Sequence, residues 1–277
     1  MRAKIVNTEN RMMLIKTLTR LRIRGAAVPG ICLVHGATGS GKTTALASAV
    51  AAYDAAFVRA EAMGCAGSLL DDICFELGVA APYRNAAKFK AITSELKRKP
   101  RPLFVDEVDY LLRESRQLEM LRDLHDSTGV PIILIGMEEI EKKLLNYPQL
   151  TRRISNRLHF GPCDLADAQL LASELCEVEI EPELLAKMHG KAQGCIGLMV
   201  LALSLFEAQA KEEGQKRIGI ADWGGQDMFL VKPKRNEREK GRGAKDKGQA
   251  ALGVLARPNA KESGPKGGEA ERVREAT

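Results

Sequence analysis

Gly36-Ala37-Thr38-Gly39-Ser40-Gly41-Lys42-Thr43 is the stretch that decides the fold of this chain. It matches the pattern G-x-x-x-x-G-K-[ST], in which glycines let backbone N–H groups wrap around phosphate oxygens. An apolar run over 31–35 comes before it, and an alanine-rich segment over 44–52 comes after it. We therefore predict a buried strand, a phosphate-binding loop that extends to Thr44, and a helix whose N-terminus faces the same anion.

Leu103-Phe104-Val105-Asp106-Glu107 supplies the second half of a nucleotide site. A carboxylate at the C-terminal end of a buried strand can hold Mg²⁺ beside phosphates, and a second carboxylate next to it can polarise the attacking water. We assign Asp106 and the Thr43 hydroxyl to Mg²⁺ and Glu107 to the water. Lys42 is expected to reach the outer phosphates, which makes Glu107 and Lys42 candidate catalytic residues.

Strands and helices alternate through the first part of the chain. Apolar runs predict strands over 31–35, 55–60, 103–105, 131–136 and 158–160. Helical spacing or composition predicts helices over 8–24, 44–52, 68–77, 85–99, 111–127 and 138–146. This alternation implies an α/β fold with a parallel sheet covered by helices on both faces.

After residue 164 the pattern changes to helices alone, expected over 165–176, 181–190 and 195–212. We predict four parts in chain order. They are an N-terminal amphipathic helix (1–29), an α/β nucleotide-binding core (30–162), a small helical lid (163–231) and a disordered basic tail (232–277). The tail carries 13 Lys/Arg and 7 Asp/Glu, so the net charge of +6 belongs to it and the rest of the chain is neutral.

Composition excludes several classes of protein. No apolar run reaches the roughly 18 residues of a membrane span, and the N-terminus lacks the apolar stretch of a signal peptide. The cysteines and histidines show no metal-ligand spacing, and the cysteines are interpreted as reduced core residues. We therefore expect a cytoplasmic protein without a membrane partner, a disulfide framework or a zinc site. The scattered cysteines are Cys32, Cys65, Cys74, Cys163, Cys176 and Cys195.

The phosphate loop, the LFVDE strand and the later helical segment together resemble an AAA+ P-loop ATPase. Three further stretches narrow the resemblance to the DNA-transposition ATPases of Mu-like phages (the B protein) and related transposon target-capture ATPases. They are the basic amphipathic helix before the first strand, the run from Asp106 to Leu111, and Ile135-Gly136-Met137-Glu138 leading into residues 147–154. The resemblance covers roughly residues 5 to 225.

This resemblance implies a function, cofactors and partners. The cofactors would be ATP and Mg²⁺, and the protein would be an ATPase that yields ADP and phosphate. It would bind double-stranded DNA without sequence specificity, assemble on it as a homo-oligomeric ring or helical filament, and direct target selection by a transposase. If the chain is phage-encoded, the compartment would be the cytoplasm of the bacterial host.

The resemblance also implies that an arginine from one subunit reaches the γ-phosphate bound by the next, where it stabilises charge on the transferring group. Arg153 occupies the matching place, with Arg152 as the near alternative and Arg157 as a weaker one. Two positions depart from the family pattern. Gly136 and Met137 stand where a polar sensor usually ends the strand, and the turn over 194–198 offers no arginine. We therefore expect slow, regulatory hydrolysis.

No helix-turn-helix or zinc-finger signature is present, so base-specific reading of DNA is not expected. Sequence-neutral binding needs only cations placed along phosphates. Three regions could supply them: the helix over 85–99, the basic end of the first helix (Arg20, Arg22 and Arg24), and the tail. Because family members enclose DNA within a ring or filament, the resemblance favours Lys88 and Lys90 on the helix over 85–99.

Other roles for such an ATPase remain open. The main alternative is a replication-initiator or helicase-loader type of AAA+ ATPase, although the sequence shows neither a sequence-specific DNA module nor a helicase-binding segment. A regulatory ATPase of a secretion system would carry a membrane span or wall-binding domain. A metabolic P-loop kinase fits less well, because the acidic strand and the arginines before residue 154 suit hydrolysis coupled between subunits.

Overall fold

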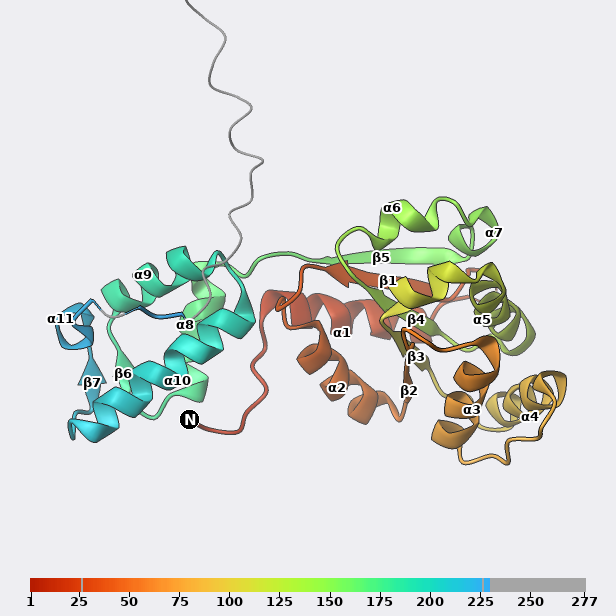
Figure 1. Cartoon of the computed structure of the whole chain (residues 1–277), viewed down its shortest axis with the longest axis horizontal. Helices are drawn as coiled ribbons and strands as arrows, with labels where there is room; N and C mark the ends of the chain where they lie inside the picture. The colour runs from red at the N-terminus through yellow and green to blue at the C-terminus, as the bar shows by residue number, and fades with distance from the viewer. Residues whose placement is uncertain (26, 226, 230–277) are drawn as a thin grey trace, which may run out of the picture. The chain divides into compact units, whose positions relative to one another are not determined.

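The computed structural model describes residues 1–25, 27–225 and 227–229 and contains a parallel sheet of five strands (Figure 1). The strands are β1 (Ile31–Gly36), β2 (Ala56–Arg59), β3 (Leu103–Asp106), β4 (Ile132–Gly136) and β5 (Ile154–Phe160). Their order across the sheet is β2-β3-β4-β1-β5, and every pairing is parallel. The phosphate loop therefore leaves a central strand, and the predicted α/β fold with a parallel sheet is confirmed.

Helices cover both faces of this sheet because successive strand residues point in opposite directions. In β1, Ile31 and Leu33 join the core under α3 and α5, whereas Cys32 and Val34 join the core under α1 and α2. The helices of this part are α1 (Glu9–Arg22), α2 (Lys42–Tyr53), α3 (Ala66–Leu77), α4 (Asn85–Arg98), α5 (Ser115–Thr128), α6 (Ile140–Leu144) and α7 (Pro148–Thr151).

The residues after Phe160 fold around a separate apolar core. The helices are α8 (Leu165–Leu175), α9 (Pro182–Ala192), α10 (Ile196–Glu212) and α11 (Ile220–Trp223), joined by the short strands β6 (Glu179–Ile180) and β7 (Arg217–Ile218). Phe206 and Trp223 meet edge-to-face in this core, with ring centroids 4.7 Å apart. The β6–β7 pair and α11 were not expected from the sequence. The predicted tail over 232–277 lies outside the described residues.

Two predicted elements differ from the structure by more than two residues at one end. β5 begins at Ile154 and not at 158, because an edge strand with one solvated face alternates apolar and polar residues, and only its last residues form an apolar run. The helix expected over 111–127 is divided. A 3₁₀ segment, η1 (Val108–Arg113), precedes α5, and the extended backbone of Glu114 separates them.

None of the helices in the described part of the chain combines the length and the apolar character that a membrane span needs.

Candidate nucleotide site

The phosphate loop is shaped by its glycines and by Lys42. Gly39 and Gly41 have φ values of 81° and 84°, in the left-handed region that side chains other than glycine rarely adopt. α2 begins at Lys42, so its N-terminal N–H groups face the loop. The Lys42 ammonium donates to the Gly36 carbonyl at 2.7 Å and to the Ala37 carbonyl at 2.8 Å. The lysine thus lies folded over the loop that it is predicted to serve.

Lys42 is partly withdrawn from water. Desolvation lowers its pKa below the ordinary value, and the nearby carboxylates of Asp106, Glu138 and Asp109 act in the opposite direction. The Asp106 carboxylate belongs to the same cavity as Lys42, so a lysine and a carboxylate face one volume. A cation beside a carboxylate suits the recognition of a metal-bound phosphate.

Asp106 and Glu107 lie where the sequence predicted them, at the C-terminal end of β3. Asp106 is buried, and its Oδ1 accepts the Glu107 backbone N–H at 2.9 Å. Glu107 adopts a left-handed backbone with φ of 55°, which is uncommon for a residue with a side chain. Such strain is concentrated at functional sites, and here it turns the chain sharply between two adjacent carboxylates.

One cavity of about 430 Å³ brings together the phosphate loop and both carboxylates. The predicted residues that line it are Thr38, Gly39, Gly41, Lys42, Thr43, Thr44, Asp106 and Glu107. The donor set fits Mg²⁺, because a Thr hydroxyl and a carboxylate face the place where phosphate oxygens would complete the coordination. Three predicted loop residues, Gly36, Ala37 and Ser40, do not line this cavity. Gly36 and Ala37 offer carbonyls to Lys42, and the buried Ser40 hydroxyl lies 3.4 Å from its ammonium.

An apolar cavity of about 360 Å³ continues the site. It shares Gly41, Thr44, Ile196 and Val200 with the first cavity, and its other walls come from the first eight residues, α1, α2 and α8. A polar cavity for phosphates beside an apolar cavity suits a nucleotide, because the flat faces of its base pack on apolar surface. The contribution of the N-terminal segment could not be predicted from the sequence, because its residues form no local motif.

The helical part of the chain after Phe160 contacts the phosphate loop through the start of α10. The Gly197 backbone N–H donates to the Gly39 carbonyl at 3.1 Å, and the Cys195 thiol lies 3.6 Å from the same carbonyl. A Cβ on Gly39 would approach the Cys195 sulfur to 2.6 Å, so this contact requires glycine. The turn that lacks the usual arginine therefore binds the loop through backbone and thiol.

Gly136, at the position of the expected polar sensor, is enclosed by its neighbours. A Cβ there would lie 2.9 Å from both the Asp109 carboxylate and the Ile140 side chain. Asp109 instead accepts the Met137 backbone N–H at 2.7 Å. A larger side chain at 136 would displace this contact, so the packing itself explains why no sensor side chain stands at the end of β4.

Arg59 is a site residue that the sequence analysis missed. It lies at the end of β2, directly opposite Asp106 in the strand register. Its guanidinium is 3.3 Å from Asp106 Oδ2 and 3.8 Å from Glu107 Oε1. Arg59 therefore contacts both carboxylates assigned to metal and water. Only the pairing of β2 with β3 reveals this, because the two residues are far apart in sequence.

Arg153 lies far from the phosphate loop of its own chain. Its carbonyl accepts the N–H of Ile31, the first residue of β1, whereas the loop follows Gly36 at the other end of that strand. A strand of this length spans about 17–20 Å. The guanidinium forms two hydrogen bonds with Asp126, at 2.9 and 3.2 Å, which lower the pKa of Asp126. Arg153 therefore does not line the nucleotide cavity of its own chain.

The two alternative arginines have different surroundings. Arg152 is exposed, and its guanidinium forms no hydrogen bond or ion pair within the described residues; its backbone N–H donates to the Pro148 carbonyl at 3.1 Å. Arg157 lies on β5 and pairs with Glu141 at 3.3 Å.

Lys88 is buried, which corrects its prediction as a DNA contact. Its ammonium pairs with Asp71 on α3 at 2.6 Å. On α4, Lys88 precedes Ile92 and Leu96 at intervals of four residues, so it belongs to the buried face of the helix. This ammonium is already paired and shielded from solvent. Lys90 is exposed and stays a predicted contact.

Comparisons with known proteins agree with this geometry. Residues 26–144 match the family model described as an AAA domain. A stretch of 52 residues is 48% identical to a "Potential ATP-binding protein" of Staphylococcus aureus and spans 19% of this chain and 18% of that protein. Residues 26–144 therefore resemble an AAA domain, and the matched stretch spans less than a fifth of the Staphylococcus aureus protein.

Three solved structures share the fold at low sequence identity. They are Cdc6p from Pyrobaculum aerophilum (17% identity, TM-score 0.58), the ORC2 protein of Aeropyrum pernix in ADPNP–ADP complexes (17%, 0.61) and the ORC1 protein of Aeropyrum pernix in complex with DNA (15%, 0.57). The matches cover 78%, 80% and 78% of this chain and 66%, 68% and 64% of those chains, respectively. The chain thus spans about two thirds of the structures it resembles and has the fold of AAA+ P-loop proteins.

Proposed function

We propose that this chain is an ATP-dependent, sequence-nonspecific DNA-binding ATPase that oligomerises on double-stranded DNA and directs target selection by a transposase. The observation that carries the proposal is the division of the site. Lys42, Asp106 and Glu107 line one cavity at the carboxyl ends of the strands. Arg153 lies beside the start of β1, at the amino ends of the strands. An arginine placed there completes the site of a neighbouring subunit, so ATP acts as an assembly signal as well as a fuel.

Each residue of the site has a role in this proposal. Lys42 contacts the outer phosphates, and Asp106 and Thr43 hold Mg²⁺, which neutralises phosphate charge when bound. Glu107 orients and polarises the attacking water. Arg153 of the neighbouring subunit stabilises the charge that develops on the transferring phosphoryl group.

Hydrolysis is proposed to be slow. Gly136 offers no side chain to the γ-phosphate or to the water, and Arg59 competes with the metal for the Asp106 carboxylate. Slow turnover suits a switch that persists on DNA. Steady-state turnover measured with saturating DNA tests this point, and a rate of about ten per second or more would be typical of an ordinary enzyme and would contradict it.

The transposition role depends on the resemblance of residues 106–111 and 135–154 to target-capture ATPases. One observation favours a second candidate, a replication-initiator type of AAA+ ATPase. The similar structures are a Cdc6p and two ORC proteins, one of them in complex with DNA. Both candidates share an ATP-dependent, DNA-bound assembly, and they differ in whether DNA sequence matters.

Negative-stain microscopy with double-stranded DNA of unrelated sequences separates these functions. The protein would be imaged with ATP, with ADP and without nucleotide. We expect ATP-dependent rings or filaments on every DNA sequence. Assemblies confined to particular sequences would favour the initiator, and rings that form without regard to DNA would contradict both candidates.

Replacing Arg59 by Ala is expected to lower the Mg²⁺ concentration needed for half-maximal ATP turnover by about two- to fivefold. The guanidinium is half exposed, so its ion pair with Asp106 is worth less than about 1 kcal/mol. The measurement is a Mg²⁺ titration of turnover. Arg116→Ala is the matched control, because Arg116 is exposed on α5 and has no partner within the described residues. An unchanged or higher Mg²⁺ requirement for Arg59→Ala would show that Arg59 does not compete with the metal.

A further inference from the structure

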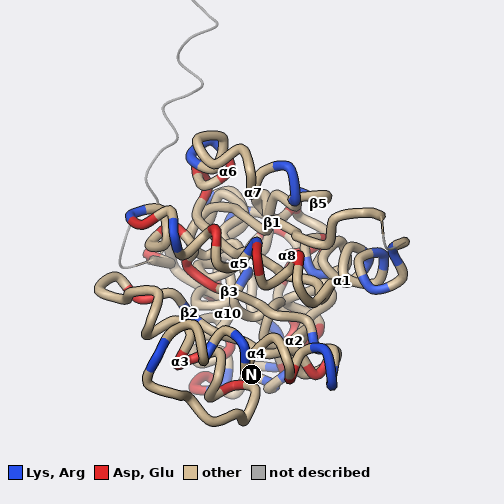
Figure 2. Tube along the Cα trace, turned by 90° about the vertical axis from the view of Figure 1, so that its right-hand side faces the viewer, with Lys and Arg blue, Asp and Glu red and all other residues tan. Residues whose placement is uncertain are grey.

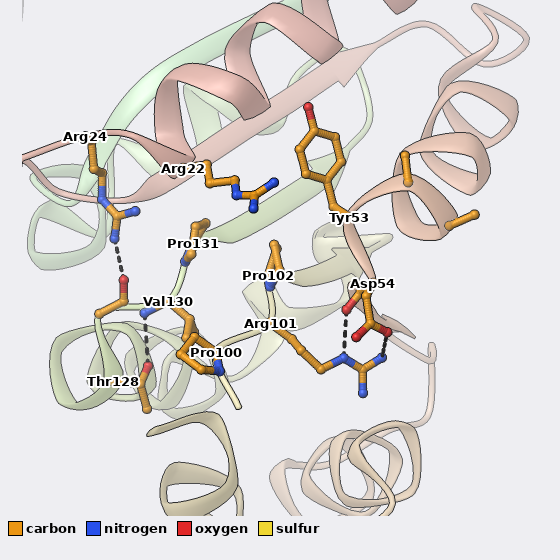
Figure 3. Close-up of a pocket in the computed structure, with 13 residues that line it drawn as sticks. Arg22, Arg24, Tyr53, Asp54, Pro100, Arg101, Pro102, Thr128, Val130 and Pro131 are labelled. Carbon is orange, nitrogen blue, oxygen red and sulfur yellow. Dashed lines mark hydrogen bonds and ion pairs between the residues drawn. The ribbon is translucent and has the colours of Figure 1, made fainter. Parts of the chain in front are cut away.

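A cavity of about 550 Å³ lies at the amino-terminal edge of the sheet, outside the nucleotide site (Figure 3). Its walls are the ends of α1 and α2 and the segments that lead into β3 and β4. Three arginines line it, Arg22, Arg24 and Arg101, with Asp54 as the one carboxylate among its lining residues. Figure 2 views the molecule from this side, and the end of α1 is blue there, the colour of Lys and Arg. The volume is in the range of ligand-binding pockets.

Arg101 lies in one wall of the cavity, where its guanidinium binds backbone carbonyls. Its guanidinium donates to the carbonyls of Asp54 at 2.7 Å, Glu76 at 3.2 Å and Ala55 at 3.3 Å. It also lies 3.4 Å from the Asp54 carboxylate, which pairs with Lys99 at 2.9 Å. Asp54 has a left-handed backbone with φ of 47°. Arg101 therefore holds the strained end of α2 in place, and the only carboxylate of the cavity is already neutralised.

Arg24 builds the opposite wall in the same way. Its guanidinium donates to the carbonyls of Leu21 at 2.7 Å and Val28 at 3.2 Å, and also to the carbonyl of Gly129. These bonds join the end of α1 to the loop that precedes β4. Arg24 and Arg101 are thus both bound to backbone carbonyls in the walls of the cavity.

Arg22 is different, because its guanidinium has no hydrogen-bond or ion-pair partner within the described part of the chain. Its side chain is exposed and in Figure 3 extends from the Pro131 side of the cavity toward Tyr53. A guanidinium is always charged and binds carboxylates with two parallel hydrogen bonds. Arg22 is therefore free to bind an anionic group that enters the cavity.

The floor of the cavity is apolar. Pro100, Pro102 and Pro131 lie there beside Val130 and the ring of Tyr53 (Figure 3). Proline has no backbone N–H, so these positions offer no donor to a ligand. The Tyr53 hydroxyl is already within 3.1 Å of the Thr19 hydroxyl. The floor can hold an apolar side chain but supplies little hydrogen bonding.

We propose that this cavity docks a short segment of a partner protein in which an Asp or Glu lies beside an aromatic or aliphatic residue. The apolar side chain packs on the proline floor, and the carboxylate binds Arg22. The surplus of positive charge favours an acidic segment. A DNA duplex fits less well, because its backbone presents phosphates but has no apolar group to bury among prolines. This inference does not depend on the proposed function.

The test is a selection from a library of random peptides about twelve residues long on the full-length protein, with counter-selection on Arg22→Glu. We expect recovered peptides to pair acidic with apolar residues. In fluorescence polarisation they should bind Arg22→Glu about tenfold or more weakly than the wild type. Ala52→Trp, which fills the cavity from α2, should weaken them similarly. Lys16→Glu, an exposed site on the same helix that does not line the cavity, should bind like the wild type.

The binding of a fluorescent ATP analogue to each variant controls for folding. Recovered peptides that bind Arg22→Glu or Ala52→Trp as tightly as the wild type would overturn the proposal. So would a selection that yields no acidic peptides. If Arg22→Glu instead weakens binding of a DNA duplex of about 20 base pairs, the surface belongs to nucleic acid. If Arg22→Glu changes only the ATP-dependent sedimentation coefficient of the protein, the surface is an interface between copies of this chain. Either result would replace the docking proposal.

Discussion

Arg153→Ala is expected to lower ATP turnover on DNA by about 10³-fold while leaving ATP affinity nearly unchanged. The reason is that Arg153 lies at the edge of the sheet remote from its own phosphate loop and would act only on a neighbour's nucleotide. Turnover would be measured with saturating DNA, and affinity would be measured with a fluorescent ATP analogue. Loss of the exposed pair with Asp126 should leave folding stability nearly unchanged, because solvent-exposed ion pairs contribute little.

Arg152→Ala is the matched control. Arg152 is the exposed neighbour of Arg153, and its side chain forms no hydrogen bond or ion pair in the described residues. It should retain turnover. If Arg152→Ala lost activity and Arg153→Ala did not, the assignment would pass to Arg152. If both variants lost the ability to bind ATP, the arginines would instead have a role within their own subunit.

Glu107→Gln is expected to lower turnover by about 10²-fold or more and to preserve ATP binding. The amide keeps the size of the side chain but cannot accept a proton from water. Because hydrolysis would disassemble the complex, this variant should also prolong ATP-dependent assemblies on DNA. Turnover and the lifetime of the assemblies on DNA, followed by light scattering, are the two measurements.

Glu139→Gln provides the control for Glu107→Gln, because Glu139 is an exposed carboxylate that does not line the nucleotide cavity. It should behave like the wild type. A Glu107→Gln protein that still hydrolyses ATP within about threefold of the wild-type rate would exclude Glu107 as the base, since a positioned base contributes far more than that.

The parts of the site that could be predicted from sequence are those encoded by neighbouring residues. The phosphate loop and the Asp106-Glu107 pair each follow an apolar strand, so a local pattern places both at the C-terminal edge of a parallel sheet. The contact of Arg59 with Asp106 could not be predicted, because it depends on the register in which β2 pairs with β3. The apolar cavity could not be predicted either, because residues that are far apart in the sequence, such as Met1 and Val200, line it together.

Lys88 shows the converse error, a charged residue assigned to the surface from its type alone. Its spacing to Ile92 and Leu96 placed it on the buried face of α4, but only the packing of α3 against α4 brings Asp71 to its ammonium. β5 was predicted too short for a related reason. Its polar residues are compatible with a strand only at the edge of the sheet, a position that the strand order decides.

In the proposed function, an arginine from a neighbouring subunit completes each nucleotide site. The most direct test is to mix Arg153→Ala subunits with Glu107→Gln subunits and to measure the ATP turnover of the mixture on DNA. Each variant alone should be inactive. In an equimolar mixture about a quarter of the interfaces would join an intact Glu107 to an intact Arg153 from the other variant. Mixing is therefore expected to restore turnover to about that fraction of the wild-type rate. A mixture as inactive as its two components would contradict it.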